Sequence, residues 1–194
     1  MSILHTKGLS FRKKRKKVNS SSAKNAALWA LEIVVVLVVA FMIVYFAGMK
    51  VTVVGNSMEQ TLSDNSQVLV NRFNYIIGNP KSGDVIAFLP NGNEKSHYYI
   101  KRVVGVPGDK VQIKDGVLYV NGEMFDSTDT EAIANAGIAE EEITIGDGEY
   151  FVLGDNRNSS EDSRYANIGN IKKEYITGKV WFKIKPFKSM GRVK

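Results

Sequence analysis

Hydrophobic residues along the chain form one long segment followed by many short runs. Residues 26–49 contain a single charged side chain, Glu32. As an α-helix these 24 residues would be about 36 Å long, enough to cross a hydrocarbon core of roughly 30 Å. A core helix rarely has so many β-branched residues and no polar face. We therefore predict a transmembrane anchor over 26–49, with Glu32 near the membrane interface, where a charge costs less than at mid-bilayer.

From Lys50 onward the chain alternates between short β-rich runs and turn residues, a pattern typical of strands. The predicted strands are 51–54, 67–71, 84–89, 98–106, 110–114, 117–122, 149–154 and 176–184. Asp115-Gly116 and Asn121-Gly122 predict consecutive hairpins over 110–125. Residues 130–142 have a helix-forming composition but contain Gly137, which leaves a short helix or a loop open. The predicted fold is mainly β, an antiparallel-sheet domain on one N-terminal helix.

The net charge of +6 comes from the N-terminal tail. Residues 1–25 contain eight Lys or Arg and no acid, while the rest contains 18 basic and 20 acidic residues. A basic nucleic-acid-binding face is therefore not indicated. Because Lys and Arg favour the cytoplasmic side, we predict a cytoplasmic tail over 1–25 and an extracytoplasmic domain over 50–194. The apolar segment exceeds the usual 7–15 residues of a cleavable signal peptide, which favours an uncleaved anchor.

Composition limits the chemistry that the chain can perform. Cysteine is absent, which excludes disulfides, thiolate metal sites and a cysteine nucleophile. The two histidines, His5 and His97, are too few for a histidine-rich zinc site. A Ser-His-Asp triad would have one realistic base, His97. No metal or organic cofactor is implied.

Three polar stretches are candidates for catalysis. Ser57 follows a predicted strand and Gly55, a place that suits a nucleophile because glycine lets a substrate backbone approach. A serine in a turn is more often a simple hydrogen-bonding residue. Ser57 and its neighbours are the first of the three stretches. The third stretch, 154–164, is a dense polar loop after a predicted strand. It fits either an ion-pair network that shapes a site or a solvated surface loop.

The second stretch places Lys101 in the middle of the predicted strand 98–106. Strand alternation puts Tyr99, Lys101 and Val103 on one face and Arg102 on the other, which indicates a structural role for Arg102. Burial would lower the pKa of Lys101, and a neutral amine can act as a general base. From the residues alone, a lysine that extends to solvent from a sheet edge is the favoured interpretation.

Taken together, these stretches resemble the type I signal peptidases, bacterial membrane-anchored serine proteases with a Ser/Lys dyad. The resemblance covers essentially the whole chain, and the small size and single span are similar to the Gram-positive form. The matching residues are Ser57-Met58, Lys101-Arg102-Val103-Val104-Gly105 with Pro107-Gly108-Asp109, and Gly154-Asp155-Asn156-Arg157 with Ser160, Asp162, Ser163 and Arg164. Gln60 departs from the pattern, because the family usually has proline there. Gly55 departs too, since some members have at this position a serine whose hydroxyl helps to line the oxyanion hole.

The resemblance implies a role for each matching residue. Ser57 would attack the scissile carbonyl, and Lys101 would take its proton and later protonate the leaving amine. The backbone N–H of Ser57 would stabilise the oxyanion, at a hole where Gly55 brings no hydroxyl. The remaining implied roles are orientation of the lysine amine by Ser160, a supporting ion pair of Asp162 with Arg164, and a substrate pocket lined by Met58.

The resemblance also implies a substrate and a location. The enzyme would remove N-terminal signal peptides from exported preproteins after small-x-small motifs such as Ala-x-Ala, next to the lipid bilayer and the Sec translocation machinery. It would be a single-pass cell-membrane protein with an extracellular catalytic domain, and would bind no nucleic acid. The apolar run 73–77 fits either a membrane-resting surface or core packing.

Three alternatives remain open at this point. His97 lies four residues before Lys101, so in an extended strand both side chains face the same side, and His97 is the rival candidate for the general base. A β-domain that binds exported peptides without catalysis is a second alternative, which Gln60 favours weakly. A self-cleaving Ser/Lys repressor is a third, but the transmembrane segment occupies the place of its DNA-binding domain.

Overall fold

The computed structural model describes residues 20–125 and 131–193, so most of the predicted tail lies outside the described residues. Helix α1 (Ser20–Ala47) includes a 22-residue segment, Lys24–Tyr45, that is long and apolar enough to cross a membrane. The helix starts earlier and ends earlier than the predicted anchor 26–49. By internal contacts the chain divides at Phe41 into two compact units.

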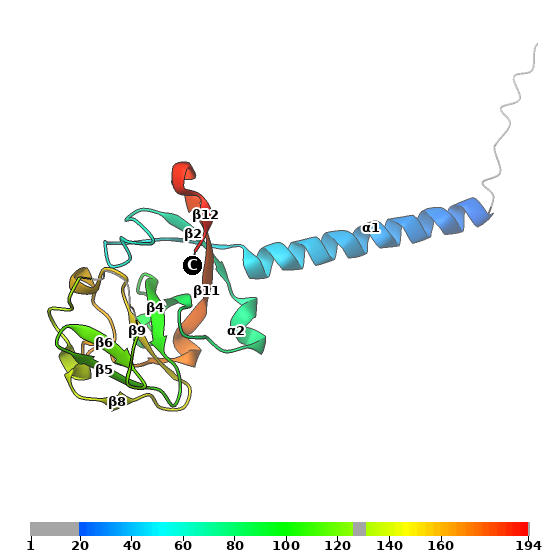
Figure 1. Cartoon of the computed structure of the whole chain (residues 1–194). Helices are drawn as coiled ribbons and strands as arrows, with labels where there is room; N and C mark the ends of the chain where they lie inside the picture. The colour runs from blue at the N-terminus through cyan, green and yellow to red at the C-terminus, as the bar shows by residue number, and fades with distance from the viewer. Residues whose placement is uncertain (1–19, 126–130, 194) are drawn as a thin grey trace, which may run out of the picture. The chain divides into compact units, whose positions relative to one another are not determined.

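The larger unit contains an antiparallel sheet of eight strands in the order β1-β2-β11-β3-β4-β9-β10, with β12 paired to β11. Figure 1 labels β2, β4, β9, β11 and β12 of this sheet. The long strand β11 lies between β2 and β3, which joins the end of the chain to its middle. The strands are β1 (Met49–Thr52), β2 (Gln67–Asn71), β3 (Val85–Phe88), β4 (Tyr99–Gly105), β9 (Glu149–Leu153), β10 (Ile171–Lys172), β11 (Ile176–Lys185) and β12 (Gly191–Arg192). The prediction of a mainly antiparallel β fold is confirmed.

A second antiparallel sheet has the order β7-β6-β5-β8. Its strands are β5 (Lys110–Lys114), β6 (Val117–Val120), β7 (Glu123–Met124) and β8 (Ile143–Thr144). The predicted consecutive hairpins are present. Asp115 and Gly116 have φ of 54° and 76°, and Asn121 and Gly122 have 54° and 81°. Two successive positive φ angles match the twist of paired strands, which explains the Asp-Gly and Asn-Gly pairs.

Helical structure in the larger unit is short. Helix α2 (Phe73–Ile77) is accompanied by 3₁₀ turns at η1 (Pro90–Gly92), η2 (Gly137–Glu140), η3 (Arg157–Ser159), η4 (Lys173–Tyr175) and η5 (Phe187–Ser189). The predicted segment 130–142 is therefore mainly a loop over its described part. Gly137 has φ of +55°, and a Cβ there would lie 2.2 Å from the carbonyl oxygen of Arg164. That close approach holds the loop against the polar stretch 154–164.

The apolar run 73–77 is partly buried and partly exposed, so core packing is confirmed for one residue and the membrane-resting role stays a prediction. Tyr75 is buried and its hydroxyl donates to Asp84 Oδ2 at 2.9 Å, so this side chain is part of the core. Ile76 and Ile77 are 63% and 77% exposed. The run therefore contributes one aromatic side chain to the interior and presents its last two residues to the surface.

Strand β4 is buried on both faces because it contributes to three separate hydrophobic clusters. Ile100 packs in the cluster with β1 and β2, Val104 packs with the second sheet, and Val103 packs with β3 and β9. A side chain in the middle of this strand is therefore removed from water even when it is polar. Lys101 lies at that point.

Candidate active site

Ser57 lies in a loop after β1 that is held by hydrogen bonds within the loop. The N–H of Val53 donates to Ser66 O at 2.8 Å, and the N–H of Gly55 donates to Asp64 Oδ1 at 2.8 Å. Gly55 has φ of +83°, which favours glycine and turns the chain toward Ser57. Met58, the next residue, is fully buried. Ser57 is therefore a half-buried residue between Gly55, which is hydrogen-bonded to Asp64, and the buried Met58.

The Ser57 loop is also tied to the polar stretch 154–164, far away in the sequence. The N–H of Asn156 donates to Ser57 O at 3.0 Å, and the N–H of Asp155 donates to Met58 Sδ at 3.4 Å. A Cβ on Gly154 would lie 2.4 Å from Ser57 O and 2.3 Å from Ser160 Oγ. Glycine is required here because the two segments touch at its Cα. In the sequence, Gly154 stands out only as a motif residue, and its one signal is a glycine at the end of a predicted strand.

Lys101 lies in β4 and is paired with Ile86 of β3. The residue is 4% exposed, so it does not extend to solvent from a sheet edge as the residues alone favoured. Its Nζ lies 5.7 Å from the centre of the Tyr99 ring. Burial lowers the pKa of Lys101 to about 8, against the opposing effects of Asp162 and Glu161. Roughly a tenth to a fifth of the amine is therefore neutral near physiological pH, far more than for an ordinary lysine.

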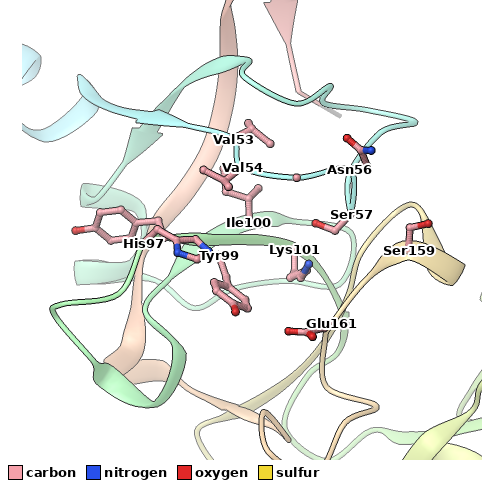
Figure 2. A pocket seen from close by; sticks show the side chains of 12 residues that line it. Val53, Val54, Asn56, Ser57, His97, Tyr99, Ile100, Lys101, Ser159 and Glu161 are labelled. Atoms are coloured by element: carbon pink, nitrogen blue, oxygen red, sulfur yellow. The ribbon is translucent and has the colours of Figure 1, made fainter.

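Ser57 and Lys101 line the same pocket, and Figure 2 shows both labelled side chains at its centre. Ser57 comes from the loop after β1, whereas Lys101 comes from the centre of β4. The pocket is lined by Val53, Val54, Gly55, Asn56, Ser57, His97, Tyr98, Tyr99, Ile100, Lys101, Ser159 and Glu161. A serine hydroxyl and an amine whose pKa is lowered to about 8 thus share one partly apolar cavity. That pairing suits acyl transfer.

Asp162 and Arg164 form a buried two-pronged ion pair, as predicted. Arg164 Nε and Nη2 donate to Asp162 Oδ1 and Oδ2 at 2.8 and 3.0 Å, and both side chains are almost fully buried. The pair also organises its surroundings. Asp162 Oδ2 accepts the N–H of Gly154 at 3.1 Å, and Arg164 Nη2 donates to Ser160 O at 3.2 Å. The ion pair therefore positions the loop that contacts Ser57.

The hydroxyl of Ser160 is buried beside Gly154. Within the part of the chain that the structure describes, Ser160 Oγ has no hydrogen-bond partner. The predicted hydrogen bond to the Lys101 amine is therefore not formed in this structure. A buried hydroxyl without a partner costs free energy, so it is a group whose satisfaction would be favourable.

Arg102 faces away from Lys101, as strand alternation predicts. Its Nε and Nη2 donate to Asp155 Oδ1 and Oδ2, both at 2.7 Å, and Thr61 Oγ1 donates to Asp155 Oδ2 at 2.6 Å. Arg102 Nη1 also donates to Gly83 O at 2.8 Å. This network joins β4 to the loops before and after the pocket, which is a structural role.

Met58 and His97 are placed differently from the roles considered for them. Met58 is fully buried among the core residues of β1 and β2 and does not line the pocket, so its predicted contact with substrate needs correction: the side chain is used for packing. His97 does line the pocket, exposed and stacked on Tyr99 at 5.1 Å between ring centres. No described carboxylate is hydrogen-bonded to His97, so the orienting partner of a Ser-His-Asp triad is missing from residues 20–125 and 131–193.

Across 20–125 and 131–193 there is no group of three or more His, Asp or Glu side chains arranged to hold an ion. The pocket itself offers one carboxylate and one imidazole, from Glu161 and His97.

Comparison with known proteins identifies the family of the chain. The family model described as signal peptidase, peptidase S26, matches residues 26–185. Signal peptidase IB of Staphylococcus aureus strain Mu50 is 42% identical over 98 residues, which is 50% of each chain. Signal peptidase I P of Bacillus subtilis subsp. natto is 40% identical over 94 residues, 48% of this chain and 50% of that protein.

Among solved structures, a signal peptidase I from Enterococcus faecalis V583 is 32% identical, with a TM-score of 0.43, and the match covers 54% of this chain and 98% of that chain. The chain spans about half the length of the curated relatives it matches. The family model, in contrast, covers the apolar helix and nearly all of the β-sheet unit. The chain therefore belongs to the S26 family of signal peptidases.

Proposed function

We propose that the chain is a membrane-anchored serine endopeptidase that removes signal peptides from exported preproteins after small-x-small motifs. The observation that carries the proposal is the shared pocket of Ser57 and Lys101, in which burial lowers the pKa of the amine to about 8. Membership of the S26 family supplies the substrate class. Helix α1 would be the anchor, with its N-terminus in the cytoplasm and the β-sheet unit outside the cell.

In the proposed mechanism, Ser57 Oγ attacks the carbonyl carbon of the scissile bond while neutral Lys101 takes the hydroxyl proton. The resulting ammonium group of Lys101 then protonates the leaving amine as the C–N bond breaks. Water attacks the acyl-enzyme ester in the second half-reaction and transfers its proton to Lys101. Ser57 and the neutral amine are thereby regenerated.

The tetrahedral intermediate needs hydrogen-bond donors for its oxyanion. Among the described residues, no group accepts a hydrogen bond from the Ser57 N–H, which leaves this donor for the substrate. One such donor contributes about 2.7–4 kcal/mol to the transition state in other hydrolases. Gly55 lines the same pocket but brings no hydroxyl, so the proposed hole relies on backbone donors.

The proposed function is tested with the full chain purified in detergent and a preprotein that carries one Ala-x-Ala site. We expect mass spectrometry to show cleavage after that site by the wild type and by His97→Ala, and none by Ser57→Ala or Lys101→Ala. Loss of activity in folded His97→Ala equal to that in Lys101→Ala would favour histidine as the base. No cleavage of several preproteins by folded wild type would favour a peptide-binding module.

Ser160 is proposed to orient the Lys101 amine during turnover. Replacement of Ser160 by alanine is expected to lower kcat/KM by about 10- to 100-fold, the usual value of a hydrogen bond to a charged group. The free energy of unfolding should change by less than about 1 kcal/mol, because the hydroxyl has no partner to lose in the described structure. Peptide cleavage and urea denaturation measure the two quantities.

A matched control for Ser160 is Ser66→Ala, because Ser66 Oγ is also buried without a partner among the described residues. Ser66 does not line the pocket, so its replacement should leave kcat/KM unchanged. Equal activity of wild type and Ser160→Ala would exclude the orienting role.

A further inference from the structure

The rim of the pocket carries one carboxylate, that of Glu161. Its side chain is exposed, and within 20–125 and 131–193 it makes no hydrogen bond or ion pair. The next residue, Asp162, is in contrast fully buried and paired with Arg164. The two neighbouring carboxylates therefore differ in role. Asp162 stabilises the loop through its ion pair with Arg164, whereas the fold does not require the carboxylate of Glu161.

Glu161 is the charge that remains in the pocket when the proposed base is ready to react. Lys101 accepts the serine proton only as a neutral amine. With Lys101 neutral, Glu161 supplies the one formal charge, of −1, among the Asp, Glu, Lys and Arg side chains that line the pocket. The carboxylate also raises the pKa of Lys101, which shows that its field reaches the reacting groups. The pocket therefore favours a cation that arrives with the substrate.

Peptide geometry says where that cation would lie. The scissile carbonyl must approach Ser57 Oγ, and successive side chains of an extended peptide point in opposite directions. If the two small residues of a small-x-small motif face the wall of the cavity, the middle residue and the first residue after the cut face away from it. Figure 2 shows Glu161 next to Lys101 among the side chains that line the pocket, so a long substrate side chain that faces away from the cavity wall is the one expected to meet it.

We propose that Glu161 is a specificity-determining residue that favours preproteins with Lys or Arg at the middle position of the motif or at the first position after the cut. This inference rests on the proposed peptidase function. A partly screened ion pair at an exposed rim should be worth up to about fivefold in kcat/KM. Glutamate at the same substrate position should be disfavoured to a similar degree.

The test uses the full chain in detergent and preproteins with one Ala-x-Ala site that differ only at the two named positions. Each position is occupied in turn by Lys, Gln or Glu, and kcat/KM is measured at low and high salt. We expect the wild type to prefer Lys over Glu by about 5- to 25-fold at one position, less so at high salt. Glu161→Gln should bring this ratio close to one, and Glu161→Lys should reverse it.

Glu141→Gln is the matched control, because Glu141 is also exposed and has no hydrogen-bond or ion-pair partner within the described residues, but does not line the pocket. It should keep the wild-type ratio. An unchanged ratio in Glu161→Gln would overturn the proposal. Equal slowing of all substrates by Glu161→Gln would also overturn it, since the carboxylate would then act only on the Lys101 amine. Absence of cleavage by wild type would instead contradict the proposed function itself.

Discussion

Replacement of Lys101 by methionine is expected to abolish cleavage and, at the same time, to stabilise the folded protein near neutral pH. Methionine keeps the apolar stem in a position that is 4% exposed but removes the amine. Loss of a general base together with its proton-donor role should lower kcat/KM by at least about 10³-fold. The two opposite effects separate a chemical role from a structural one.

The gain in stability follows from the lowered pKa of Lys101. Burial moves this pKa from 10.5 to about 8, so protonation of the folded state at pH 7 costs roughly 3 kcal/mol. A lowered lysine pKa means that the folded state disfavours the protonated amine, so protonation of Lys101 destabilises the fold. The unfavourable contribution is absent above pH 10.5, grows as the pH falls, and is complete below about pH 8. Lys101→Met should therefore gain stability at pH 7, and the gain should vanish toward pH 10.5.

Urea denaturation of wild type and Lys101→Met at several pH values measures this difference. In parallel, kcat/KM of the wild type should rise with pH and level off above about pH 8, as the free amine forms. Substantial cleavage by folded Lys101→Met would show that another group takes the proton. A stability difference that does not depend on pH would show that the amine is not desolvated.

Replacement of Gly154 by alanine is expected to disable the site without removing any catalytic group. The added Cβ would lie 2.4 Å from Ser57 O and 2.3 Å from Ser160 Oγ, far inside contact distance. The Ser57 loop and the Ser160 loop must therefore separate by about 1 Å, a displacement that costs roughly 100-fold in rate when it affects reacting groups. Overpacking should also lower the free energy of unfolding by about 1–3 kcal/mol.

Gly191→Ala is the control for this prediction, because a Cβ on Gly191 meets no atom within 4 Å and its φ is not positive. It should keep both activity and stability. Peptide cleavage is measured below the unfolding transition, so that loss of fold is not mistaken for loss of geometry. Full activity in Gly154→Ala would show that the contact between the two loops is not needed for catalysis.

Much of the fold was predictable because its signals are local. Each of the eight predicted β-rich runs contains or overlaps a strand, and the Asp-Gly and Asn-Gly pairs occupy the expected hairpin turns. The order of the strands was not predictable in the same way. Strand β11 lies between β2 and β3, a pairing of segments about 100 residues apart. Such pairing depends on long-range contacts that no local pattern reports.

The sequence by itself determined the transmembrane-type helix, the β-rich unit and the candidate pair Ser57 and Lys101, because length, alternation and motif order are properties of the chain. Tertiary structure alone decided the environments. The pKa of Lys101 is lowered because β4 pairs with β3 and β9 in the interior of the sheet and the side chain is buried, and Met58 is core because residues of β1 and β2 pack around it. Burial depends on neighbours distant in sequence, so the solvation of a charged or apolar side chain follows only from the folded arrangement.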